Sequence, residues 1–228
     1  MVTALVACGG ETPQPEVPKV EAPPEEGPRR AALPSVESEV GALDQAKVKA
    51  AFQKSQDRLM ACYTKGAQRL AYLSGEVKFF VRVAKDGSAR RAYLEESTLG
   101  DRETERCMID VLKGVGWPRP EGGEGEARHS LTFVPGDDER MPVSWSVEQL
   151  GAPYKNARPK LAQCRKKAGA KPMKATLYVE TDGKPAAVGV SIADERGEEA
   201  VDCVIAALSS VKFPSPGSFA SKVTIPIE

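Results

Sequence analysis

The chain has 228 residues, and its 32 Lys and Arg side chains balance its 32 Asp and Glu side chains, so the formal net charge is zero. This balance argues against binding to nucleic acid through bulk charge. No apolar run approaches the roughly 20 residues of a transmembrane helix. The single histidine, His129, argues against most metal sites and catalytic triads.

The first eight residues end in a short apolar run and a cysteine. Leu5, Val6, Ala7 and Cys8 resemble a bacterial lipobox, in which the cysteine becomes the lipidated N-terminus. A secretory signal carries a basic segment and about 7–15 apolar residues before its cleavage site. We therefore interpret residues 1–8 as a truncated lipoprotein signal, with the true start codon upstream. The alternative is an unmodified cysteine in a cytosolic leader.

Residues 9–42 are rich in proline and glutamate. Seven acidic and three basic side chains in residues 9–41 give a net charge of −4. Proline fixes φ and removes backbone donors, so such a segment favours extended polyproline II structure and buries no core. The sequence predicts a disordered, semi-rigid tether that holds a globular part away from a membrane surface.

From about residue 43 the same order of features occurs twice. Three unlike features of the first copy recur 96 positions later: a turn, a cysteine, and an aromatic residue followed by Pro-x-Pro. A constant offset across three unlike features indicates an internal duplication. The matched positions are Asp86-Gly87 with Asp182-Gly183, Cys107 with Cys203, and Trp117 with Phe213.

Each copy predicts the order helix, strand, strand, helix, strand. Apolar residues at helical spacing mark the first helices, with Gly66 as a candidate C-cap in the first copy and Pro153 and Pro159 shortening or breaking the helix of the second. Alternating patterns at residues 77–83 and 175–179 predict half-buried strands. The turns Asp86-Gly87 and Asp182-Gly183 predict hairpins, because glycine supplies a positive φ.

The predicted fold class is therefore α+β, with two tandem domains after the tether. Each domain is expected to have a three-stranded antiparallel sheet and two helices. The predicted domains are residues 43–136 and 147–228, joined by a linker at residues 137–146.

Five cysteines are present, and removing Cys8 for lipid leaves two per copy. Four cysteines allow three pairings, and the duplication selects Cys62–Cys107 and Cys164–Cys203. Disulfides persist in oxidising compartments, which agrees with export. The alternatives are free cysteines buried on helix faces, or a metal site, which the lone His129 and the absence of a CxxC motif disfavour.

Several of these features together resemble a known family. Ala61-Cys62-Tyr63, the strand from Gly75, Asp86-Gly87, Cys107 and Trp117-Pro118-Arg119-Pro120 are similar to the AgmX/PglI C-terminal domain, a TonB C-terminal-like module of myxobacterial-type envelope proteins. The second copy is less similar, since Arg165 follows its first cysteine and its first strand lacks the leading glycine. The resemblance implies a TonB-C-like fold, periplasmic exposure and no catalysis.

The functional expectation is a non-enzymatic cell-envelope lipoprotein whose two modules bind envelope proteins. Sheet edges can take an extended peptide as an added strand, which is the expected binding mode. The charged side chains Lys78, Arg82, Arg90 and Arg91 would tune the choice of partner, or simply form a solvated face. Lipid on Cys8 is expected to anchor the protein to a membrane, with the outer membrane favoured over the inner. No cofactor, metal, nucleic acid or small-molecule substrate is expected.

Three other functional classes remain as alternatives. A secreted inhibitor would present exposed aromatic anchors, and only Trp145 and Phe219 are candidates. An enzyme could use the acidic cluster Asp137-Asp138-Glu139, although this run lies in the expected linker and has no counterpart in the second copy. A structural envelope protein without a discrete ligand also fits the sequence.

Overall fold

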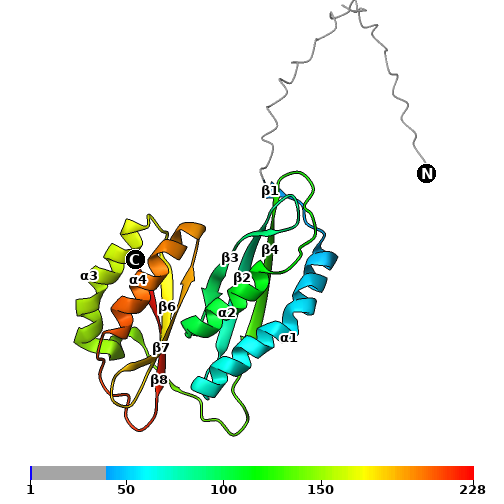
Figure 1. The fold of residues 1–228 in the computed structure, drawn as a ribbon. Helices are drawn as coiled ribbons and strands as arrows, with labels where there is room; N and C mark the ends of the chain where they lie inside the picture. Colours follow the sequence, from blue (N-terminus) through cyan, green and yellow to red (C-terminus); the bar gives the residue numbers. More distant parts are fainter. Residues whose placement is uncertain (2–39) are drawn as a thin grey trace, which may run out of the picture. The chain divides into compact units, whose positions relative to one another are not determined.

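A computed structural model describes residue 1 and residues 40–228 of the chain. The described residues from Val40 onward belong to one compact unit. The fold is α+β, with four helices and two four-stranded sheets (Figure 1). The lipobox with Cys8 and most of the predicted tether lie outside the described residues.

The first repeat contains two helices and four strands. Its strand order is β1-β4-β2-β3, in which β2 pairs antiparallel with both β3 and β4. The elements are β1 (Val40–Gly41), α1 (Gln45–Arg69), β2 (Gly75–Val83), β3 (Ala89–Ser97), α2 (Arg102–Lys113) and β4 (Glu124–Phe133).

The second repeat has the same topology. Its strand order β5-β8-β6-β7 reproduces that of the first, and two short 3₁₀ helices precede its α-helices. The elements are β5 (Val143–Ser144), the 3₁₀ helix Val147–Leu150, α3 (Gly151–Lys167), β6 (Met173–Val179), β7 (Pro185–Ile192), the 3₁₀ helix Glu195–Gly197, α4 (Glu198–Ser209) and β8 (Ser221–Ile227).

The prediction of three-stranded sheets was wrong by one strand in each repeat. The segment before each first helix adds a two-residue strand that pairs in parallel, β1 with β4 and β5 with β8. Two residues cannot carry an alternating hydrophobic pattern, so the sequence gives no signal for these strands. Their effect is to cover the first two residues of an otherwise open sheet edge.

Helix α1 begins at a side-chain cap and passes beyond its predicted end. The Asp44 carboxylate accepts hydrogen bonds from the backbone N–H groups of Ala46 and Lys47. Gly66 is not the C-cap, because the helix continues to Arg69 and is capped at Leu70. A Cβ at Gly66 would stand 2.0 Å from Oγ1 of Thr104, so this glycine permits the close approach of α2.

The corresponding helix of the second repeat is shorter than that of the first, and its prolines do not break it. Helix α3 has 17 residues where α1 has 25, and Pro159 lies inside it. Pro153 is the third residue of α3, where a backbone N–H has no partner within the helix.

The repeated turn and the repeated aromatic residue touch each other. Gly87 and Gly183 have φ values of 86° and 84°, as the turns require. The N–H of Trp117 donates to the carbonyl of Gly87 at 2.9 Å, and that of Phe213 donates to Gly183 at 2.8 Å. A Cβ at Gly87 would lie 2.6 Å from the Trp117 carbonyl oxygen. The two sequence motifs recur together because each hairpin is docked on the segment that follows the second helix.

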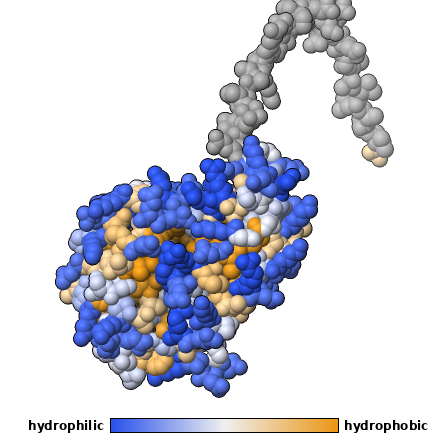
Figure 2. Space-filling model, viewed as in Figure 1, coloured by the Kyte–Doolittle hydropathy of each residue, from blue (hydrophilic) through white to orange (hydrophobic). Residues whose placement is uncertain are grey.

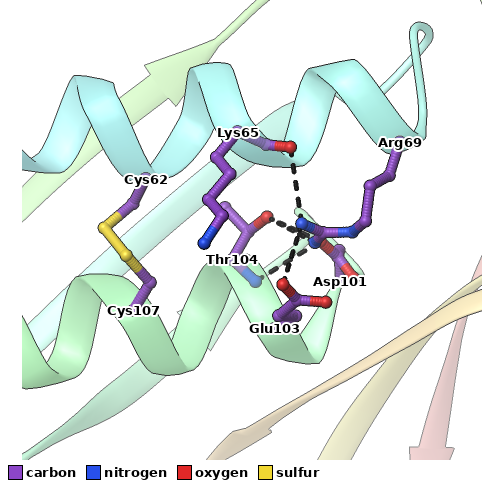
Figure 3. The surroundings of a disulfide bond; sticks show 7 residues. All are labelled: Cys62, Lys65, Arg69, Asp101, Glu103, Thr104 and Cys107. Atoms are coloured by element: carbon purple, nitrogen blue, oxygen red, sulfur yellow. Dashed lines mark hydrogen bonds and ion pairs between the residues drawn. A yellow bond between two sulfur atoms is a disulfide. The ribbon is translucent and has the colours of Figure 1, made fainter.

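Each repeat has its own disulfide between its two helices. Cys62–Cys107 joins α1 to α2, and Cys164–Cys203 joins α3 to α4, with Cα separations of 5.8 and 5.7 Å. Both predicted pairs are therefore present. Figure 3 shows the first bridge and, near it, Arg69 of α1 reaching Asp101 and Glu103 at the start of α2.

Replacing Cys164 and Cys203 together by alanine is expected to lower the free energy of unfolding by about 2–4 kcal/mol, because the bridge closes a loop of 39 positions in the unfolded chain. The matched double variant, Cys62→Ala with Cys107→Ala, removes a bridge that closes a loop of 45 positions. Its free energy of unfolding should fall by a similar amount. Urea unfolding measures both. A loss of less than about 1 kcal/mol in either variant contradicts a stabilising role for that bridge.

Candidate functional site: the repeat interface and the sheet edges

The two repeats exchange side chains across an interface formed by the edge strands β3 and β7 (Figure 1). Tyr178 from β6 is fully buried in the core of the first repeat. Phe80 and Tyr93 from the first sheet are stacked at 4.7 Å and buried in the core of the second repeat. The repeats therefore share their cores and are not two independent modules.

Tyr178 is held by the backbone of the first repeat. Its hydroxyl donates to the carbonyl of Ser74 at 2.9 Å and accepts from the Ser74 N–H at 3.1 Å. The ammonium group of Lys222 in β8 donates to the same carbonyl at 2.5 Å. Tyr72 adds a hydrogen bond to Glu180. These contacts fasten the segment between α1 and β2 to the second sheet.

Glu105, in the first turn of α2, is a completely buried polar link between the repeats. Its carboxylate accepts from the hydroxyl of Ser97 at 2.6 Å and from the N–H of Gly100 at 3.2 Å, both within the first repeat. It also accepts from the N–H of Val190 in β7 at 3.3 Å. A Cβ at Gly189 would lie 2.4 Å from this carboxylate, so only glycine leaves room for it.

Burial is the largest cause of the pKa shifts of Glu105 and Lys222 at this interface. It raises the pKa of Glu105 to about 7, although the hydrogen bonds from Ser97, Gly100 and Val190 favour the ionised form. Burial also lowers the pKa of Lys222 to about 8, while the charge of Glu105 acts in the opposite direction. Both groups thus titrate closer to neutrality than they would in water.

The interface uses one edge of each sheet. Strands β3 and β7 are the end strands of their sheets, and each faces the other repeat. The Glu105 carboxylate accepts from the backbone of β7, in place of a neighbouring strand. An incoming peptide therefore meets another part of the protein, and not an open ladder, at these two edges.

The opposite edge of the second sheet is obstructed at two positions of β8. The backbone N–H of Trp145 donates to the carbonyl of Lys222 at 2.9 Å, and the Tyr154 hydroxyl donates to the carbonyl of Pro226 at 3.1 Å. Both carbonyls point away from β6, and the N–H of a strand residue points to the same side as its carbonyl. Pro226 has no N–H, so this edge offers an added strand no donor there and an acceptor that is already occupied.

The corresponding edge of the first sheet is more open. Beyond Gly125, β4 has no strand partner on this side among the residues that the structure describes. Ser130 pairs with Lys78 as Pro226 pairs with Lys174, so Ser130 occupies the position of Pro226 in the first repeat. Unlike proline, it carries a backbone N–H. Arg128, Ser130 and Thr132 are all exposed.

The four charged residues predicted to tune binding are all engaged in ion pairs within the chain. They lie over the outer face of the first sheet, and exposed pairs of this kind stabilise a fold weakly. The pairs are Lys78 with Glu95 and Glu96, Arg82 with Glu126, Arg90 with Glu124, and Arg91 with Glu195 of the second repeat.

The remaining sequence candidates do not converge on a site. Asp137, Asp138 and Glu139 lie exposed in the loop after β4. His129 stacks on Phe52 at 4.6 Å, and burial lowers its pKa. Trp145 is partly buried against the second core, and Phe219 lies against Tyr72 and under Arg140. In residues 40–228, no group of three His, Cys, Asp or Glu side chains is placed to hold a metal.

A polar hollow lies between α2 and α4. It holds about 290 Å³, with Leu94 and Val190 among its apolar lining and Arg106, Asp110 and Asp202 among its charged lining. Figure 2 shows hydrophobic residues near the middle of this face, surrounded by hydrophilic ones. The hollow is a consequence of the repeat interface.

Comparison of the chain with protein-family models, with curated proteins and with solved structures finds no match. Within the part of the chain that the structure describes, no helix is long and apolar enough to cross a membrane. The two disulfides indicate a location outside the cytoplasm.

From the sequence alone, Glu105 is an acidic side chain near the start of a predicted helix, which is a favourable place for it. Sequence reasoning missed the buried bridge to Val190 because the residues involved lie 85 positions apart. The one available signal was Gly189, a glycine in the interior of a strand pattern, which often marks a close approach of another group.

The free energy of unfolding is expected to fall as the pH rises from about 4.5 to about 7. Over this window Glu105 stays protonated in the folded protein but loses its proton in the unfolded chain. The contribution of Glu105 to stability is therefore greatest below its pKa in the unfolded chain, and it is lost as the pH rises through its pKa in the folded protein. The loss is on the order of 3 kcal/mol. Urea unfolding of the parent and of Glu105→Gln at several pH values measures it. Equal declines in the two proteins would exclude Glu105 as the titrating group.

Gly189→Ala is expected to destabilise the protein by about 1–3 kcal/mol, since its Cβ would collide with the Glu105 carboxylate. Gly116→Ala is the matched control, because a Cβ at Gly116 meets nothing within 4 Å. Thermal or urea unfolding compares the two variants. A Gly189→Ala protein as stable as the control would show that the close packing of β7 on Glu105 is not required.

Proposed function

We propose that this protein is an exported, non-enzymatic lipoprotein of the cell envelope that binds extended segments of partner proteins. The two disulfides support export, because such bonds persist where the surroundings are oxidising. The lipobox-like run ending at Cys8 supports lipid attachment, with the outer membrane as the favoured site. The likeness of the first repeat to TonB C-terminal-like modules supports a binding role.

The open edge of β4 is the single observation that carries the binding mode. An exposed strand edge presents N–H and C=O groups that an extended peptide can pair with, and side-chain pockets then select the sequence. The other long edges of the two sheets are occupied or blocked: β3 and β7 by the repeat interface, and β8 by Pro226 and Tyr154. The first repeat would therefore hold the binding site, with the second repeat covering its β3 edge.

The side chains along β4 define what such a peptide would meet. Arg128 and its ion-pair partners Glu95 and Glu126 lie on the outer face, beside Ser130 and Thr132. Both signs of charge are present and already paired with each other. We therefore expect backbone pairing to supply most of the affinity, and a partner segment of mixed or low charge.

Ser130→Pro is expected to abolish capture of envelope proteins by the full chain, because it removes the edge N–H as Pro226 does in the second repeat. Ser130→Ala removes the hydroxyl but keeps the N–H, and should capture as the parent does. The measurement is cross-linking in an envelope extract, with disulfide mapping to verify that both variants fold.

Amide hydrogen exchange supplies an independent measurement. The amides of Arg128, Ser130 and Thr132 should exchange quickly in the free protein and slowly in the complex. Full capture by Ser130→Pro, or no protection of these amides on binding, would reject strand addition at β4.

A further inference from the structure

Positive charge is concentrated in one segment of the second repeat, although the whole chain is neutral. Residues 149–179 contain eight Lys and Arg side chains and no Asp or Glu. Seven of the eight are exposed, and Arg165 is half-buried with a hydrogen bond to the Ala170 carbonyl. The eight are Lys155, Arg158, Lys160, Arg165, Lys166, Lys167, Lys171 and Lys174.

These cations have no carboxylate partners within the described part of the chain. Fourteen contacts between oppositely charged side chains occur in residues 40–228, and none includes a cation of residues 149–179. The outer face of the first sheet, by contrast, pairs its bases with its own acids. Helix α3 is thus an uncompensated positive surface.

An apolar hollow of about 660 Å³ lies between this helix and the end of β8. Val147, Tyr154, Leu161 and Ile227 contribute to its lining. Lys155 and Arg158 also line it, together with the C-terminal residue Glu228. The hollow therefore combines an apolar surface with two cations from α3 and one acidic residue, Glu228.

We propose that α3 and this hollow form a docking surface for anionic phospholipid at a membrane surface. The exposed cations would contact the headgroup phosphates, and the apolar lining would receive part of an acyl chain. This chemistry needs no backbone pairing, and none is offered here, because Pro226 lacks an N–H and its carbonyl is taken by Tyr154. An acidic peptide strand would lose that pairing, so the observations favour lipid.

The docking surface is separate from the β4 edge and does not depend on the binding mode proposed there. It lies on α3 and β8 of the second repeat, whereas the edge lies on β4 of the first. It would supply a protein contact with the membrane besides any lipid on Cys8, and would orient the second repeat toward the headgroups.

The test uses the full chain with Cys8→Ser, so that no acyl anchor contributes. Sedimentation with vesicles of phosphatidylglycerol and phosphatidylethanolamine is compared with sedimentation with phosphatidylcholine vesicles. The protein should bind the anionic vesicles and be released by high salt. Replacing Lys155, Arg158, Lys166 and Lys167 by glutamine should weaken partitioning on the order of 1,000-fold.

The matched control carries four glutamines on the first helix of the first repeat, at Lys47, Lys49, Lys54 and Lys65. It has the same change in net charge. Equal losses of vesicle binding in the two variants would mean that only the net charge of the protein matters, and would overturn the proposal. Absence of binding to the anionic vesicles would also overturn it.

Two soluble probes examine the hollow itself. Dihexanoyl phosphatidylglycerol should shift the resonances of Tyr154 and Leu161, and glycerol phosphate at the same concentration should not. Equal shifts with both probes would mean that phosphate alone is bound and would reject the acyl site. An oligoglutamate peptide that shifts the same resonances in a protein that does not bind the anionic vesicles would assign the surface to an acidic protein partner and reject lipid.

Discussion

The buried carboxylate of Glu105 is one constraint on how the two repeats pack against each other. It accepts hydrogen bonds from Ser97 and Gly100 in its own repeat and from Val190 in the other. An ionised group without water is costly to bury, and these three donors offset part of that cost. The raised pKa of Glu105 shows that burial still outweighs the hydrogen bonds. The interface is thus specific in geometry and sensitive to pH.

Fixing the repeats together also decides which backbone remains available for binding. Packing β3 on β7 occupies one edge of each sheet, and Pro226 with Tyr154 closes a second edge. What differs between the repeats is therefore as informative as what they share. The first repeat keeps an edge N–H at Ser130, and most bases on the outer face of its sheet pair with acids of the same repeat. The second has proline at the matching position and leaves the cations of α3 without partners.

The sequence by itself determined the elements that local chemistry specifies. The duplicated Asp-Gly turns, the order of helices and strands and the two disulfides follow from periodicity and from a repeat at a fixed offset, and the structure contains all of them. Predictions that needed the exact ends of elements were less successful. Gly66 lies inside α1, where it leaves room for α2 and does not end the helix. Two-residue strands such as β1 carry no periodic signal.

Only the tertiary structure decided how the repeats meet and which edge stays open. Glu105 and Gly189 lie far apart in sequence, and their contact follows from the packing of two sheets whose relative placement no local pattern encodes. The same holds for Tyr178, an outward residue of one strand that becomes a core residue of the other repeat. Side-chain alternation tells which face of a strand is apolar, but not what covers the opposite face. That choice is made by long-range contacts.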